Sequence, residues 1–173
     1  MQLRKNININ LLTEQSFPTY DIEKKKNCIL HFGVGNFHRA HQALYIHELL
    51  ENNQNISIIG VNLRSNDTNL KLIKQDYFYT LVRISEDFKD MKILNPIKKI
   101  LFGKKDKIEI RNLIASKDIK LITLTVTEKG YHFNKDKKLN YSEDIMNDLE
   151  NKNLNTVIGH ISFGLIERFK LNK

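Results

Sequence analysis

The chain has 173 residues, 40% of them hydrophobic, which is enough for one domain with a buried core. Its 28 basic and 20 acidic residues give a formal net charge of +8. The six arginines are scattered and the lysines occur in short runs interleaved with acids, which favours a solvated surface over a nucleic-acid-binding stripe.

The cysteine content and the hydropathy exclude further classes of protein. Cys28 is the one cysteine, so no internal disulfide can form, and this indicates a reducing compartment. The opening residues alternate Asn and Ile and do not build the apolar core of a signal peptide. No apolar run approaches the roughly 18 residues that span a membrane. We therefore expect a soluble, cytoplasmic protein with no membrane partner.

The chain divides into an arm and a domain. Residues 1–27 are polar, interrupted by Pro18 and ending in a lysine run, and they predict an amino-terminal arm. Residues 28–173 show the alternation of apolar strand-like and helix-like segments that a single α/β domain requires.

Three strands alternate with two helices in the first half of the domain. A continuous apolar run predicts a buried strand at 28–32, and apolar residues at helical spacing predict a helix at 37–50. A second β-branched run predicts a strand at 56–61, buried on both faces. Capping side chains begin a short helix at 65–75, and aromatic and β-branched residues predict a third strand at 77–84.

The second half continues the alternation. It predicts a short strand within 91–102, a helix at 105–116, a strand at 119–127, a polar loop at 128–140, and helices near 142–149 and at 156–169. Strands that alternate with helices favour a mostly parallel sheet covered on both faces, which is the doubly wound α/β class.

A glycine pair lies between the first strand and the first helix. Gly33 and Gly35 lack a Cβ, so they permit a tight turn and a close approach of backbone to a ligand. The helix that follows directs free N–H groups and the positive end of its dipole into the same space, which suits a pyrophosphate. His38 stands where the third glycine of a dinucleotide fingerprint would lie. From the residues alone, a nucleotide site and a plain turn both remain open.

The acid that usually contacts the adenosine ribose is missing from its usual place. That place is the end of the second strand, about 20 residues after the glycines. Val61 and Asn62 occupy it, and Asp67 is the first acid beyond. Asp67 either reaches the ribose from the loop or only caps the next helix.

Several blocks of the sequence resemble the mannitol dehydrogenase family, the long-chain polyol and hexuronate dehydrogenases. The blocks keep the family's order and are PTYD (18–21), ILHFGVGNFHRAHQA (29–43), GVNLR (60–64), ND (66–67), QDYFYTLV (75–82) and LTVTEKGY (124–131). The combination of GVGNFHRAH with TVTEKGY is highly specific, and the resemblance covers the chain from about residue 18 to its end.

The resemblance implies a Rossmann-like domain that binds NAD. The enzyme would oxidise a secondary alcohol of an acyclic polyol, or reduce the matching keto sugar or keto acid. The dinucleotide would be held by Gly33, Val34, Gly35, Asn36, Phe37, His38 and Arg39, with His38 and Arg39 beside the phosphates.

The same resemblance implies roles for two acids. Asp67 would contact the ribose and favour NAD over NADP, and Glu128 would border the nicotinamide and the substrate entrance. A solvated loop acid is the alternative for Glu128, and Lys129 is interpreted as structural because nothing in its surroundings would desolvate it.

The family's catalytic pattern is not present in this sequence. Family members usually run to more than twice this length and carry a second, mostly helical domain with a lysine, an asparagine and a histidine spaced K-x-x-x-x-N-x-x-H. These 173 residues contain no such pattern, so no catalytic residue and no metal ligand is predicted.

We therefore expect the NAD-binding domain of such an enzyme, truncated before its catalytic domain and without turnover alone. The partners would be a small polyol or keto-sugar substrate in the full-length enzyme and a separate catalytic-domain chain if the subunit is split. The alternative is a basic, non-catalytic module that binds nucleic acid or a partner protein.

Overall fold

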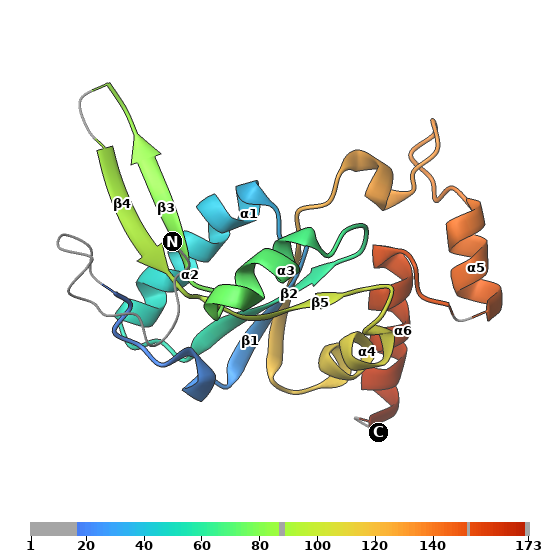
Figure 1. The fold of residues 1–173 in the computed structure, drawn as a ribbon. Coiled ribbons are helices and arrows are strands. Elements are labelled where there is room, and N and C mark those ends of the chain that lie inside the picture. Colours follow the sequence, from blue (N-terminus) through green and yellow to red (C-terminus); the bar gives the residue numbers. More distant parts are fainter. Residues whose placement is uncertain (1–16, 87–88, 152, 172–173) are drawn as a thin grey trace.

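The computed structural model describes residues 17–86, 89–151 and 153–171 (Figure 1). Residues 1–16 of the expected arm lie outside this part. The described end of the arm packs on the domain, where the short 3-10 helix η2 (Ile22–Lys24) places Ile22 in the core with 4% of its surface exposed. A hydrogen bond between the Tyr20 hydroxyl and His47 Nδ1, 2.8 Å apart, attaches the arm to the domain.

Four parallel strands form the central sheet. In spatial order they are β5 (Ile97–Phe102), β2 (Ile56–Asn62), β1 (Asn27–Phe32) and β6 (Ile119–Leu124). The strands β1 and β2 are buried along almost their whole length because helices cover both faces of the sheet. The predicted strands at 28–32 and 56–61 are confirmed, and the one at 119–127 is confirmed as far as Leu124.

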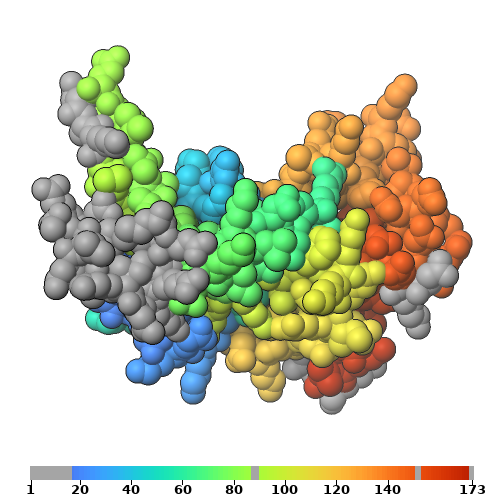
Figure 2. All heavy atoms as spheres, viewed as in Figure 1, coloured from blue at the N-terminus to red at the C-terminus, as the bar shows by residue number. Residues whose placement is uncertain are grey.

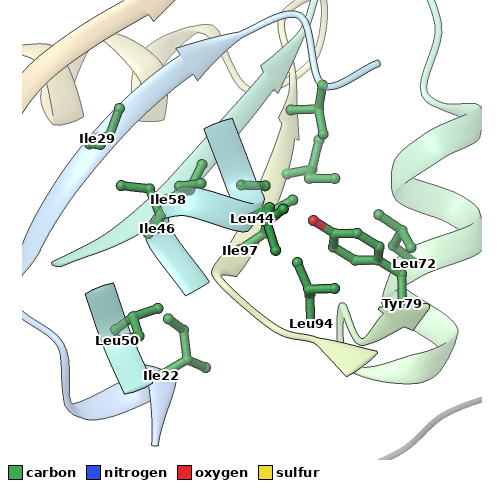
Figure 3. Packing of buried hydrophobic residues seen from close by; sticks show 13 residues of the cluster. Ile22, Ile29, Leu44, Ile46, Leu50, Ile58, Leu72, Tyr79, Leu94 and Ile97 are labelled. Carbon is green, nitrogen blue, oxygen red and sulfur yellow. The ribbon is translucent and has the colours of Figure 1, made fainter. Parts of the chain in front are cut away.

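Helices pack on both faces, as the doubly wound class requires. On one face α2 (Gln42–Glu51) and α3 (Asp67–Leu72) enclose a core with Ile29, Ile58 and Ile97 of the strands (Figure 3). On the other face α4 (Lys107–Ala115) and α6 (Val157–Leu171) enclose a second core. The core side chains of β1, β2 and β5 are divided between the two cores, whereas those of β6 all belong to the second core.

The predicted strand at 77–84 does not belong to the parallel sheet, and this part of the sequence prediction is wrong. It forms β3 (Tyr79–Ile84), which pairs antiparallel with β4 (Lys89–Leu94) in a hairpin that stands away from the body (Figure 1). Only Tyr79 of β3 is buried, whereas Ile84 is 74% exposed, so this strand is not covered on both faces. The third strand of the parallel sheet is β5, within the segment 91–102.

The predicted helix at 37–50 is two helices. The first, α1 (Asn36–Ala40), ends before His41, whose φ of −121° and ψ of −85° are not helical, and α2 begins at Gln42. The ring of His41 lies within hydrogen-bonding distance of the Phe37 carbonyl, with 2.8 Å between Nδ1 and the oxygen. The break lets α2 turn its apolar side to the sheet while Phe37 of α1 stays 66% exposed.

The segment after β6 carries short elements and then two helices. After β6, the 3-10 turn η4 (Glu128–Tyr131) opens the predicted loop, and α5 (Glu143–Asn151) precedes α6. Earlier in the chain, the 3-10 turn η3 (Ile73–Gln75) extends α3. The carboxylate of Asp148, 2% exposed, accepts hydrogen bonds from the N–H groups of Asn155 and Thr156 and from the Thr156 hydroxyl. This carboxylate fixes the start of α6 beside α5. None of the described helices is long and apolar enough to cross a membrane.

Candidate functional site

A cleft of about 820 Å³ lies at the carboxyl ends of the parallel strands, where ligands bind in open α/β sheets. Its size lies within the range of about 300–1,000 Å³ that is usual for small-molecule sites. Most of its lining comes from the turn after β1 (32–35), the loop after β2 (62–65), the segment after β6 (125–127), the start of α6 (155–157) and Lys104. Figure 2 shows the segments after β2 (green) and after β6 (orange) rising side by side on this edge.

The turn after β1 depends on its first glycine. Gly33 has a φ of +100°, and a Cβ at this position would lie 2.4 Å from the carbonyl oxygen of Thr125. Both facts require glycine. Gly35, in contrast, has an extended φ of −96°, and a Cβ there would meet only the Gly33 oxygen at 3.9 Å. The fold therefore requires Gly33, whereas Gly35 leaves open space at the turn.

The start of α1 offers unpaired backbone donors. The N–H groups of Asn36, Phe37 and His38 have no hydrogen-bond acceptor among the described residues, as expected for the first turn of a helix. The N–H groups just before them are paired, since Val34 donates to Asn62 Oδ1 at 2.8 Å and Gly35 donates to the Gly33 oxygen at 2.7 Å. Free donors at a helix start favour an anionic ligand.

The side chain of Arg39 braces this turn. Its guanidinium donates to the Val34 carbonyl at 3.3 Å and to Asn36 Oδ1 at 2.5 Å. The Tyr79 hydroxyl donates to the Arg39 carbonyl at 2.9 Å, which links α1 to the base of the hairpin. Burial lowers the pKa of the Arg39 guanidinium from its ordinary value. Neither Arg39 nor Asn36 lines the cleft.

His38 lies inside the protein and does not line the cleft. Its ring stacks on that of His31, with 3.6 Å between the ring centroids and 12° between the planes, and both side chains are fully buried. Neither ring nitrogen of His38 has a hydrogen-bond partner among the described residues. Burial, reinforced by His31 and Arg39, lowers the pKa of His38 to about 3. The side chain of His38 is therefore not placed to contact a ligand in the cleft.

The charged side chains that line the cleft are mainly cationic. Arg64 follows β2, Lys104 follows β5 and Lys129 follows β6, whereas Asp144 is the one carboxylate among the described lining residues. Strands that end at the same edge bring these residues together although they are far apart in the sequence. The resulting positive potential favours an anion.

Asp67 and Glu128 adjoin the cleft without lining it. Asp67 is exposed at the start of α3, where its N–H donates to Ser65 Oγ at 3.0 Å, and the neighbouring Ser65 and Thr68 line the cleft. Glu128 is exposed at the start of η4, and the residues on either side of it line the cleft. Each acid is thus one residue away from the lining.

Sequence reasoning missed the role of Asn62 and Thr125. At the ribose position the sequence shows Asn62 only as a residue that is not an acid, yet its side-chain oxygen accepts a hydrogen bond from the Val34 N–H. Thr125 Oγ1 donates to the Gly33 carbonyl at 2.7 Å, and its backbone approaches the same glycine. The available signal was their position, because both are polar residues that directly follow buried strands at the carboxyl edge.

A parallel sheet with the order β5-β2-β1-β6 and a glycine turn after its first strand defines a Rossmann-type domain, a class that holds dinucleotides at this edge. Residues 27–173 match the model of the mannitol dehydrogenase Rossmann domain. The chain belongs to the mannitol dehydrogenase family, a family of oxidoreductases.

Relatives and solved structures agree with this assignment. The chain is 32% identical to the mannitol 2-dehydrogenase of Pyricularia oryzae over 92% of its length, and 34% identical to that of Aspergillus fumigatus over 88%. It spans 34% and 32% of those two proteins, about a third of each.

Two solved structures superpose closely on the chain. A ternary complex of Pseudomonas fluorescens mannitol 2-dehydrogenase with NAD and D-mannitol matches 99% of the chain with a TM-score of 0.87 and 31% identity. A substrate-free D-sorbitol dehydrogenase matches 99% with a TM-score of 0.89 and 26% identity. The chain covers 37% of each of these structures. The comparisons give no support to a nucleic-acid-binding module.

The buried histidines predict that stability depends on pH. Burial lowers the pKa of His31 to about 4, of His38 to about 3 and of His160 to about 4. The unfolded chain therefore binds more protons than the folded one below pH about 6.5. The contribution of these histidines to the free energy of unfolding is therefore complete above that pH, and it is lost progressively as the pH drops towards 4.

Urea unfolding of a His38→Phe variant tests this prediction. Between pH 6 and 4.5 its free energy of unfolding should fall less steeply than that of the wild type. The difference between the two slopes should be about 1.4 kcal/mol per pH unit, the effect of one proton. His41→Phe, at an exposed ring, is the control and should keep the wild-type slope. Equal slopes for all three proteins would contradict the prediction.

Proposed function

We propose that the chain is the NAD-binding domain of an oxidoreductase that acts on the CH–OH group of a polyol or sugar acid, of the mannitol/fructose or mannonate/fructuronate type. The observation that carries this proposal is the turn at Gly33, which lines a cleft with mainly cationic side chains and leads directly into the three unpaired N–H groups of α1. The solved Pseudomonas fluorescens mannitol 2-dehydrogenase complex with NAD and D-mannitol supports the same cofactor and substrate class.

The residues present fit the diphosphate of a dinucleotide. The backbone N–H groups of 36–38 would donate to phosphate oxygens, and Gly35 leaves the space that a phosphate needs at the turn. Arg64, Lys104 and Lys129 would compensate its charge from the neighbouring strand ends. When bound, NAD supplies the acceptor for the hydride of the alcohol carbon. The task of this domain is to bind and orient that cofactor.

Asp67 and Glu128 are assigned to the two ends of the cofactor. Asp67, beside the cleft after β2, would accept a hydrogen bond from the adenosine ribose and oppose a 2′-phosphate. Glu128, after β6, would border the nicotinamide end. Their placement one residue from the lining supports both roles, since small movements of exposed side chains bring their carboxylates to the cleft.

Substitution of Gly35 tests the proposal at the phosphate turn. Gly35→Ala adds a methyl group with no close contact, so this variant should fold and bind NAD within about threefold of the wild type. Gly35→Asp adds a carboxylate at the same place and should weaken binding by about a hundredfold or more, because two anions would share the site. Isothermal titration measures both affinities, with the melting temperatures as the control for folding.

A mixed oligonucleotide in the same calorimeter distinguishes the alternative function. Saturable NAD binding that is lost only in Gly35→Asp would support the proposal. Salt-sensitive binding of the oligonucleotide with no NAD binding in the wild type would contradict it.

The preference for NAD over NADP should depend on Asp67. An Asp67→Asn variant removes the carboxylate that repels a 2′-phosphate, while Arg64 remains in the lining to attract one. We expect the ratio of the NADP to the NAD dissociation constant to fall by about tenfold. Asp118→Asn, an exposed acid before the amino end of β6, is the matched control. An unchanged ratio in Asp67→Asn would remove Asp67 from the ribose site.

We further propose that the chain binds NAD without turning over substrate by itself, because the K-x-x-x-x-N-x-x-H pattern is not in its sequence. Purified chain with NAD and mannitol, and with NAD and mannonate, should show no formation of NADH at 340 nm. The same assay with a full-length relative confirms that the conditions permit turnover. Detectable NADH from the chain alone would contradict this part of the proposal.

A further inference from the structure

We infer that His31 is a positioning residue of the dinucleotide site: its imidazole fixes the peptide unit between Gly33 and Val34, and so holds the start of α1 towards the cleft. The inference rests on the proposed function, because it assigns a residue to the same site. His31 does not line the cleft and makes no contact that would place it among the ligand-binding residues. His31 affects ligand binding indirectly, because it fixes the conformation of the turn.

The carbonyl oxygen of Gly33 is the point that His31 contacts. His31 Nε2 lies 3.2 Å from this oxygen and 3.0 Å from Thr125 Oγ1, and Thr125 Oγ1 itself donates to the same oxygen at 2.7 Å. The Gly35 N–H is a further donor at 2.7 Å. Three donors from three positions in the chain therefore converge on one carbonyl group.

The partners determine which ring nitrogen of His31 carries the proton. A carbonyl oxygen only accepts, and the Thr125 hydroxyl proton is used on that same oxygen, so Nε2 must be the donor. The buried ring is neutral, so Nδ1 is bare and accepts from the Thr123 hydroxyl at 2.8 Å. Both amide atoms of Gln42 on α2 lie 3.2 Å from Thr123 Oγ1. With the hydroxyl proton directed to the closer His31 Nδ1, Gln42 Nε2 donates to this oxygen and completes the chain of hydrogen bonds.

The other end of the same peptide unit is also held. The Val34 N–H donates to Asn62 Oδ1 at the end of β2, with a distance of 2.8 Å. A peptide fixed at both its carbonyl and its N–H cannot rotate, although glycine at 33 would otherwise allow many orientations. Without His31 and Thr125 as donors, the Gly33 carbonyl oxygen could turn to the cleft, where it would repel a phosphate.

The face of the His31 ring has a second contact, with α1. His38 lies on α1 and stacks on His31 at 3.6 Å, so the ring that holds the turn by its edge supports the helix by its face. The unpaired N–H groups of α1 therefore take their direction from a ring on β1. This geometry explains why two fully buried imidazoles lie directly beneath a site for an anion without contacting it.

Nitrogen NMR of the chain labelled with ¹⁵N in histidine tests the assignment without any ligand. His31 should show the neutral form with the proton on Nε2, and this form should persist from pH 8 down to pH 5.5. The amide proton of Gly35, bonded to the same carbonyl, should exchange slowly with solvent. A proton on Nδ1, or a ring that is charged at pH 7, would overturn the inference.

Two substitutions separate the hydrogen bond from the packing. His31→Gln places an amide nitrogen near the position of Nε2 and keeps a donor for the Gly33 carbonyl, whereas His31→Phe keeps a ring for stacking and removes the donor. His31→Phe should weaken NAD binding by about tenfold or more, and His31→Gln should restore it to within about threefold of the wild type. Both variants also lose the bond to Thr123, so that bond does not distinguish them.

Two controls measure the effects of general destabilisation. Thr123→Val removes the partner of Nδ1 and leaves the Gly33 contact, so it should weaken NAD binding less than His31→Phe does. His47→Phe removes another buried imidazole on α2, which bonds Tyr20 and lies outside the cleft lining, and it should lower the melting temperature without changing the affinity.

The outcomes distinguish this inference from the proposed function. Wild-type NAD affinity in His31→Phe, or equal losses in the Phe and Gln variants, would overturn the positioning role. If the wild type binds no NAD, the proposed function fails, and the inference is then decided by the NMR data on the His31 proton and by faster exchange of the Gly35 amide in His31→Phe than in His31→Gln. If His31→Phe does not fold, His31→Gln and the wild-type tautomer still decide it.

Discussion

The close approach of the glycine turn to the end of β6 is the constraint on which the rest of the structure depends. Gly33 leaves no room for a Cβ because the Thr125 carbonyl lies in its place, and the backbone N–H of Thr125 donates to the Phe32 carbonyl at 2.9 Å. The strand β1 lies between β2 and β6, so this contact determines where the first crossover leaves the sheet. That point determines where α1 starts and in which direction its unpaired N–H groups are aimed.

The parallel strands could be predicted from the sequence because burial on both faces demands continuous apolar runs. The runs that begin at Cys28, Ile56 and Ile119 have this property, and each forms a strand of the sheet. The hairpin could not be predicted in the same way. The residues of β3 have the same strand propensity, but propensity reports the fit to a pleated surface and says nothing about which strand pairs with it.

The position of the cleft could also be predicted, whereas the directions of the side chains around it could not. Phe37, His38 and Arg39 are adjacent in the motif, yet the helix sends them to different surroundings. Phe37 is exposed and stacks on His41, His38 is buried on His31, and Arg39 braces the Val34 carbonyl. A motif fixes which residues are near a ligand, but only the backbone geometry decides which of them present a side chain to it.

This distinction changes the account of how the cleft attracts an anion. Histidines on both sides of a glycine turn and an arginine after it, namely His31, His38 and Arg39, suggest a phosphate site built from their charges. Instead, burial keeps His31 and His38 neutral, with the pKa of each lowered well below its ordinary value, and the guanidinium of Arg39 is occupied by the turn. The cationic side chains that line the cleft are instead Arg64, Lys104 and Lys129, and the backbone N–H groups of the turn add to them. With the cleft charges supplied by other residues, His31 contacts the Gly33 carbonyl by its edge and His38 by its face, so the two histidines hold the backbone in place.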